Sequence, residues 1–140
     1  MPISKASARW DGPFKEGKGT MRPANGGEIA YTAGTRFEGV KGSNPEELIG
    51  AALAGCFSMA LSLALVKAGA APKSIETTAD VKLEKQDIGF TITGIELKCD
   101  ARVDGVDAAK FQEIALATKK GCPVSRALAV EVTLHATLAS

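Results

Sequence analysis

The stretch SNPEELIGAALAGCFSMALSLALVKAG, residues 43–69, decides how the chain folds. It begins like a helix, because the Ser-Asn-Pro at 43–45 supplies N-cap candidates and a proline for the first turn. It ends like one, with Lys67 in the last turn and Gly69 behind it. Residues 48–66 carry no charge, so nearly every face of this helix is apolar. Such a helix is either a membrane span or the buried helix of a domain.

The sequence favours the buried helix over the membrane span. Residues 48–66 are near the length that a transmembrane helix needs. However, many of them are Ala, Gly and Ser, no aromatic belt is present, and little positive charge flanks the segment. We therefore expect a fully buried helix in a soluble protein, with part of its cover contributed by a second subunit.

The composition indicates one cytoplasmic domain. The 140 residues are enough to bury a core, so residues 1–140 are expected to form a single domain. The net charge of +1, without a basic run, argues against a nucleic-acid partner. The N-terminus, MPISKASARWDG, lacks the apolar segment of a secretory signal, so a cytoplasmic location is expected. Three cysteines then indicate reduced thiols or a catalytic pair rather than structural disulfides.

Before the central helix, short alternating segments predict a small antiparallel meander. The predicted strands cover residues 3–10, 15–21 and 28–32, with Asn25-Gly26-Gly27 as a turn signal between the last two. Residues 34–39 are predicted to form a loop that leads into the helix.

After the central helix, the alternation predicts a long, bent hairpin. Residues 70–74, with Pro72, are expected to be a connector, and residues 74–85 a half-buried strand. The next strand is predicted to start with Phe90 inward and to change phase at a β-bulge near Gly94.

A second helix over residues 108–120, capped by Asp107, and a last strand over 130–138 complete the predicted order. The order predicts an α+β protein with mainly antiparallel sheets packed on the long central helix.

Two cysteines have surroundings that suit chemistry. Cys56 lies in the middle of the central helix, and Pro123 places Cys122 at the start of a short helix. A helix N-terminus lowers the pKa of a thiol at Cys122, and Gly55 leaves space beside Cys56. Most free cysteines are merely small buried side chains, so that interpretation stays open for both. Cys99 alternates in phase with apolar neighbours and is predicted to be a core thiol.

Other chemistries find no support in the sequence. It has no CxxC, its one histidine, His135, is predicted to face solvent, and its carboxylates show no ligand spacing. No metal site is therefore expected. The GxSxG and GxGxxG motifs are also absent, which argues against a serine hydrolase and a dinucleotide-binding fold.

The segments TRFEGVKGSNPEELIGAALAGCFSMALSLAL and GCPVSRAL strongly resemble the OsmC/Ohr family, the osmotically inducible and organic hydroperoxide resistance proteins. The NPEELIGAA, GCFSMALS and CPVS forms look closer to the OsmC branch. The resemblance runs from the ARW opening to the VTL strand near the end. It implies a thiol-dependent peroxidase of oxidative stress that reduces organic hydroperoxides to alcohols. It also implies an intertwined homodimer with active sites at the subunit interface.

The same resemblance implies roles for four residues. Cys56 matches the peroxidatic cysteine and Cys122 the resolving cysteine, while Arg36 and Glu46 match the pair that holds the reactive thiolate. It further implies that no metal, haem or flavin is needed, and that an external dithiol such as a lipoylated protein reduces the resulting disulfide. The chemistry is consistent, because burial raises the pKa of a mid-helix thiol and Arg36 supplies a permanent cation.

Helix geometry adds a hypothesis about the dimer. Glu46 and Cys56 would lie roughly 15 Å apart along one straight helix and about 80° around it, too far for Arg36 to bridge both. We therefore expect each site to take Cys56 and Cys122 from one subunit and Glu46, with Arg36, from its partner. The alternative to an enzyme is a redox-sensing or apolar-ligand-binding dimer on the same scaffold. The enzyme is favoured because all four chemical positions are filled.

Overall fold

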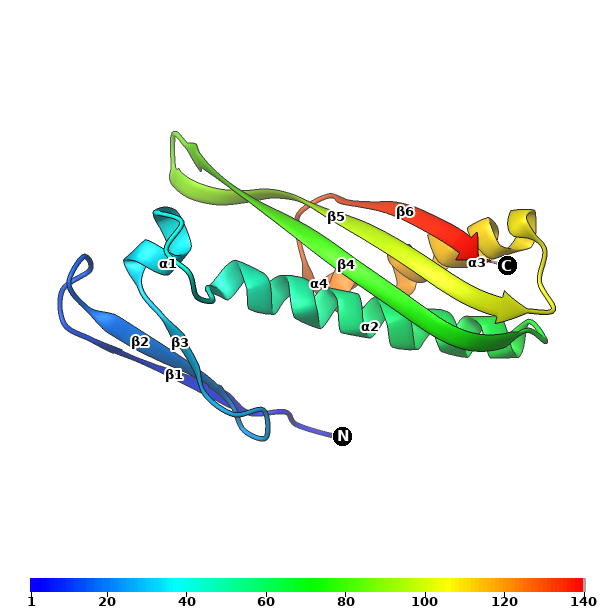
Figure 1. Ribbon diagram of the computed structural model, residues 1–140, viewed down its shortest axis with the longest axis horizontal. Coiled ribbons are helices and arrows are strands. Elements are labelled where there is room, and N and C mark those ends of the chain that lie inside the picture. The colour runs from blue at the N-terminus through cyan, green and yellow to red at the C-terminus, as the bar shows by residue number, and fades with distance from the viewer. Residues whose placement is uncertain (140) are drawn as a thin grey trace. The chain divides into compact units, whose positions relative to one another are not determined.

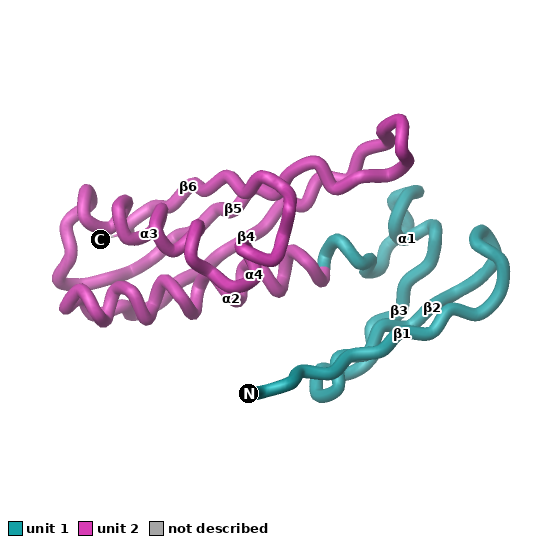
Figure 2. The backbone as a smooth tube through the Cα atoms, turned by 180° about the vertical axis from the view of Figure 1, so that it is seen from behind, with its two compact units in different colours: residues 1–47 teal, residues 48–140 magenta. Residues whose placement is uncertain are grey.

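The computed structural model describes residues 1–139, which form two compact units (Figure 2). The first unit comprises residues 1–47, and the second begins at Leu48 and contains the rest of the described chain. The elements of the chain, in order, are β1 (Ala6–Asp11), β2 (Lys18–Pro23), β3 (Ile29–Tyr31), α1 (Ala33–Phe37), α2 (Pro45–Lys67), β4 (Ala71–Gln86), β5 (Gly89–Asp104), α3 (Ala108–Gly121), α4 (Pro123–Ala127) and β6 (Val132–Ala139). The single-domain expectation for residues 1–140 stays a prediction.

The first unit contains the predicted antiparallel meander, in the order β1-β2-β3. At its centre, Gly19 is paired with Trp10 on one side and with Tyr31 on the other. A Cβ on Gly19 would lie 2.6 Å from the Tyr31 ring and 2.7 Å from the Trp10 ring. The glycine therefore allows these two rings to meet, with 5.5 Å between their centroids.

The loop predicted over residues 34–39 is wrong, because helix α1 forms there. Its N-cap is Thr32, whose hydroxyl accepts a hydrogen bond from the backbone N–H of Thr35 at 3.1 Å. In return, the Thr35 hydroxyl oxygen accepts from the backbone N–H of Thr32 at 2.9 Å. This reciprocal capping holds a helix of five residues that its propensity alone would not predict.

The predicted central helix is confirmed as α2. The Asn44 side chain caps it by accepting a hydrogen bond from the Glu47 backbone N–H at 2.9 Å. Beyond its end, Gly69 has a φ of +83°, the left-handed conformation that terminates helices and favours glycine.

Within one chain, only one face of α2 is buried. The buried face repeats every four residues and consists of Leu53, Phe57, Leu61 and Leu65. On other faces, Met59 is 77% exposed and Leu63 56% exposed. The helix is also long and apolar enough to cross a membrane by length and composition. The expectation that a second subunit contributes part of the cover of this helix therefore stays a prediction.

The second unit contains a sheet in the order β4-β5-β6, with α2, α3 and α4 packed beside it (Figure 1). Strands β4 and β5 are antiparallel, and β6 runs parallel to β5. The predicted bulge is confirmed, since the register shifts where Lys82 pairs with Gly94 and Leu83 with Ile92. The mixed fold of helices and mainly antiparallel strands agrees with the predicted α+β class.

Two details of the hairpin correct the sequence predictions. Residues 71–74 belong to β4 rather than to a connector, because β4 is an edge strand that tolerates Pro72 beside a register shift. Phe90 is 57% exposed rather than inward, since it lies next to the hairpin turn, which extends past the helices of this unit (Figure 2).

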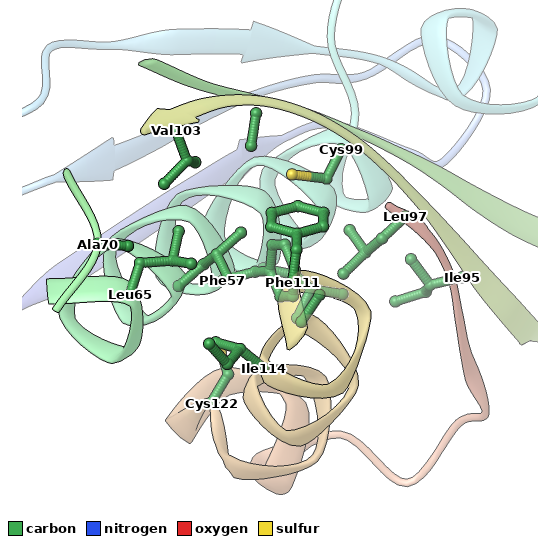
Figure 3. Packing of buried hydrophobic residues seen from close by; sticks show 14 residues of the cluster. Phe57, Leu65, Ala70, Ile95, Leu97, Cys99, Val103, Phe111, Ile114 and Cys122 are labelled. Atoms are coloured by element: carbon green, nitrogen blue, oxygen red, sulfur yellow. The ribbon is translucent and has the colours of Figure 1, made fainter. Parts of the chain in front are cut away.

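The core of the second unit joins α2, α3 and the inner face of β5 (Figure 3). Asp107 caps α3 by accepting from the Lys110 backbone N–H at 2.8 Å, as predicted. Phe111 of α3 is fully buried and packs among the same residues as Phe57 of α2. Cys122, just beyond α3, belongs to this core and therefore has a fixed position against it.

Candidate active site

The structure brings together Cys56 and Cys122, which are 66 residues apart in the chain. Their sulfur atoms lie 2.7 Å apart, and both cysteines are free thiols. Cys56 is partly exposed on α2, whereas Cys122 is only 1% exposed at the N-cap of α4. A sulfur–sulfur bond of about 2.05 Å would need only a small approach from this arrangement. The two thiols are therefore placed to exchange a proton or to form a disulfide.

Burial raises the pKa of Cys56, and so does its contact with the Cys122 thiol. The backbone N–H of Val124 acts in the opposite direction but does not overcome these effects. Cys56 lies in the twelfth position of α2, away from the helix end that could favour a thiolate. A further cation is therefore required before Cys56 becomes a thiolate at neutral pH.

Burial also opposes ionisation of Cys122, yet the pKa of this thiol is lowered overall. The Cys56 thiol favours the thiolate of Cys122, and the backbone N–H groups of Ser125 and Val124 act in the same direction. Either sulfur can donate the shared proton. We assign the lower pKa to Cys122 because it alone stands at a helix N-terminus.

In the first unit, Arg36 and Glu46 form a bidentate ion pair. Arg36 Nε lies 3.0 Å from Glu46 Oε1 and 3.2 Å from Oε2, and Arg36 Nη2 also donates to Oε1. The Glu46 side chain is 8% exposed and that of Arg36 is 34% exposed. Capping of α1 fixes the backbone of Arg36, and the first turn of α2 fixes Glu46. The pair therefore presents an oriented guanidinium that stays partly open to solvent.

An aromatic cavity of about 310 Å³ lies beside this guanidinium, entirely within the first unit. Its lining comprises Trp10, Phe14, Tyr31, Thr32, Ala33, Arg36 and Phe37. Arg36 also lies over the Phe37 ring, with 5.1 Å between the guanidinium carbon and the ring centroid. The cavity thus combines an apolar wall with one cationic group.

The four predicted site residues therefore form two pairs, Arg36 with Glu46 and Cys56 with Cys122. The prediction for Cys99 is confirmed, since it is buried in the core. His135 is exposed, as predicted. Among residues 1–139, no group of three or more His, Cys, Asp or Glu side chains could hold a metal ion.

The sequence analysis missed the aromatic cavity and the contribution of Ser125. The aromatic residues carried a usable signal, because four of the seven Phe, Trp and Tyr side chains fall before residue 38. Ser125 stands in the CPVS motif that carries the resemblance, but the sequence does not show that its hydroxyl is buried without a hydrogen-bond partner.

Comparison with known families identifies this fold. The model of the OsmC-like protein family matches residues 38–135. The chain therefore belongs to the OsmC-like protein family.

Its relatives include the peroxiredoxin OsmC of Escherichia coli, which is 54% identical over 138 residues. That match covers 97% of this chain and 96% of the relative. The peroxiredoxin OsmC of Shigella flexneri matches to the same extent.

Solved structures agree with the fold. The organic hydroperoxide resistance protein OhrB of Bacillus subtilis superposes with a TM-score of 0.72 at 26% identity, covering 96% of this chain and 98% of its own. An OsmC-like protein of unknown function from Vibrio cholerae superposes with a TM-score of 0.79 at 18% identity, covering 98% of this chain and 100% of its own. At that identity the second comparison supports the fold alone.

Proposed function

We propose that this protein reduces organic hydroperoxides to alcohols through a sulfenic acid on Cys56 and a disulfide between Cys56 and Cys122. The observation that carries the proposal is the contact of these two sulfurs at 2.7 Å. The chain is a cysteine-based peroxidase, a class supported by peroxiredoxin relatives that are 54% identical over nearly its whole length. The substrate and the role of each residue are the proposed part.

In the first step, the Cys56 thiolate attacks the distal oxygen of the hydroperoxide. The oxygen–oxygen bond breaks, Cys56 becomes a sulfenic acid, and the alkoxide takes a proton to leave as the alcohol. Burial raises the pKa of Cys56, so a cation must favour its thiolate. Arg36 is proposed as that cation, with Glu46 holding the guanidinium in a fixed orientation.

In the second step, the Cys122 thiolate attacks the sulfenic sulfur of Cys56. The sulfur–sulfur bond forms, the sulfur–oxygen bond breaks, and the released hydroxide takes a proton to become water. An external dithiol, such as a lipoylated protein, then reduces the disulfide and is itself oxidised. The proposed cycle uses no bound cofactor, and we place it in the cytoplasm.

The aromatic cavity beside Arg36 supports an organic substrate over hydrogen peroxide. Its volume of about 310 Å³ lies near the lower end for small-molecule sites. Apolar walls favour a hydrocarbon group, and the adjacent guanidinium suits the polar peroxide end.

The exposed apolar face of α2 supports a homodimer. Met59, Leu63 and Val66 are each more than half exposed within one chain, although they belong to the uncharged part of α2, residues 48–66. We propose that a second copy covers this face. In the dimer, Arg36 and Glu46 of one subunit would complete the thiol pair of the other.

The proposal is tested by mixing the reduced protein with one equivalent of cumene hydroperoxide and analysing both products. We expect one equivalent of the alcohol together with one Cys56–Cys122 disulfide, mapped by mass spectrometry. Cys99→Ala serves as the matched control, because it removes a buried thiol outside the pair. Oxidation of the pair without alcohol formation, or alcohol formation by a variant lacking Cys56, would contradict the proposal. The first result would favour a redox sensor.

A further inference from the structure

Ser125 is a partly buried residue whose hydroxyl the proposed cycle does not use. It stands at the third position of α4. Its Oγ is buried and has no complete hydrogen bond to any residue in the described part of the chain. Such an orphaned hydroxyl calls for an acceptor that appears in another state of the protein.

The nearest candidate acceptor is the sulfur of Cys122. Ser125 approaches this sulfur with its side chain and with its backbone N–H, and Val124 adds a second N–H. Pro123 has no N–H, and the Cys122 carbonyl already accepts from the Arg126 backbone N–H at 3.0 Å. The Cys122 side chain completes no capping hydrogen bond in the dithiol state. Three hydrogen-bond donors therefore lie near the Cys122 sulfur. Because a thiolate accepts hydrogen bonds more strongly than a neutral thiol, these donors would favour the thiolate of Cys122.

We infer that Ser125 is a positioning residue whose hydroxyl stabilises the Cys122 thiolate, so that Cys122 carries the negative charge whenever the disulfide forms or breaks. This inference rests on the proposed function. It specifies that Cys122 is the attacking thiolate when the disulfide forms and the leaving thiolate when the disulfide is reduced. During closure, the Ser125 hydroxyl orients the Cys122 thiolate as it attacks Cys56. During reduction, the same hydroxyl donates a hydrogen bond to Cys122 as it leaves as the thiolate.

Two properties decide which cysteine leaves as the thiolate during reduction: which sulfur an external thiolate can reach, and which of the two thiols has the lower pKa. Cys122 is 1% exposed, whereas Cys56 is partly exposed, so an external thiolate reaches the Cys56 sulfur. The new sulfur–sulfur bond then forms on Cys56, the old bond breaks, and its electron pair goes to Cys122. A thiol with a lower pKa leaves faster, which favours the same outcome. The second thiol of the reductant releases Cys56 and closes the reductant's own disulfide.

Few other titratable groups face this sulfur. Among residues 1–139, Cys56 of α2 is the titratable group in contact with it. Glu113 of α3 lines the cavity beside Cys122 but is largely exposed and pairs with Lys110. Arg126, on α4 itself, lies in its last turn. Loss of the Ser125 hydroxyl should therefore act mainly on Cys122.

The test compares wild type with Ser125→Ala and with Ser125→Thr, which keeps a hydroxyl. The disulfide is formed with diamide, so that no hydroperoxide is needed, and its reduction by dithiothreitol is followed against pH. If the Cys122 pKa rises by about one in Ser125→Ala, reduction should slow about three-fold, given the Brønsted dependence of thiol exchange. The pH profile of Cys122 alkylation in the reduced protein should move upward by the same amount, and Ser125→Thr should restore both. Equal rates and equal profiles in the alanine variant would overturn the inference.

A second measurement checks the direction itself. The diamide-oxidised protein is treated with 2-mercaptoethanol, free thiols are trapped with N-ethylmaleimide, and the mixed disulfide is located by mass spectrometry. We expect 2-mercaptoethanol on Cys56 and the maleimide on Cys122, and the reverse pattern would overturn the inference. The proposed function fails separately, if hydroperoxides do not oxidise the reduced wild-type protein.

Discussion

Replacing Arg36 with alanine should destabilise the protein more than replacing Glu46, although both changes remove the same ion pair. The asymmetry follows from burial, because the Glu46 side chain is 8% exposed and that of Arg36 is 34% exposed. Arg36→Ala leaves a buried carboxylate without its cation. Glu46→Ala leaves a guanidinium that water already reaches, so its charge remains solvated.

The magnitudes follow from the same difference. Breaking a fully buried pair by removing one partner costs about 3–5 kcal/mol. Water reaches this pair through Arg36, so we expect about 2–3 kcal/mol for Arg36→Ala, including the lost contact with the Phe37 ring. For Glu46→Ala we expect about 1 kcal/mol, nearer to the value of an exposed pair. The double variant should be more stable than Arg36→Ala, because no charge is then left buried.

Urea denaturation followed by circular dichroism measures these free energies of unfolding. The matched control is Arg22→Ala, which breaks the exposed Arg22–Glu28 pair in the same unit. This control should lose less than about 1 kcal/mol. Equal losses for Arg36→Ala and Glu46→Ala, or losses no larger than the control's, would refute the reasoning from burial.

Three further changes have defined outcomes. Cys122→Ser should prevent disulfide formation and expose the Cys56 sulfenic acid to over-oxidation. Mass spectrometry detects this over-oxidation as added oxygen atoms on Cys56. A variant that still turns over with a dithiol and gains no oxygen would contradict the resolving role of Cys122. Leu63→Glu should convert a dimer to monomers in analytical ultracentrifugation, since it removes about 2 kcal/mol of apolar burial from each subunit and buries a charge. An unchanged sedimentation coefficient would place the interface elsewhere. Burial raises the pKa of Cys99 above that of an unfolded thiol, against a smaller opposite effect of Thr77, so the folded protein holds this proton more firmly. The contribution of protonated Cys99 to the free energy of unfolding is therefore complete below pH about 8.5, and it falls above that pH by at most about 1.4 kcal/mol per pH unit. In urea denaturation at several pH values, Cys99→Ala should remove this part of the pH dependence.

Much of the fold could be predicted from local patterns. The uncharged run and its caps predicted α2, and the phase change at Gly94 predicted the bulge in β5. Helix α1 escaped prediction because Gly34 lowers helix propensity and the compensating side-chain caps involve only Thr32 and Thr35. The start of β4 was missed because Pro72 was taken as a break, whereas an edge strand accommodates a proline.

The candidate site was predictable in its residues but not in its surroundings. The family motifs indicated both pairs, and the position of Cys122 at a helix start predicted the direction of its pKa. The short distance between Cys56 and Cys122 depends on how α2 and α4 pack, which no local pattern encodes. The orphaned hydroxyl of Ser125 is likewise a result of packing. The sequence therefore indicated the reacting groups, whereas the groups that change the pKa of the two cysteines could be found only from the tertiary structure.

The central claim is that Cys56 is the group that hydroperoxides oxidise. It is tested most directly by the steady-state consumption of cumene hydroperoxide with dihydrolipoamide as reductant. Wild type and Cys99→Ala should turn over at similar rates, whereas Cys56→Ser should show no consumption above the reaction without protein. Turnover by Cys56→Ser at the wild-type rate would contradict the account.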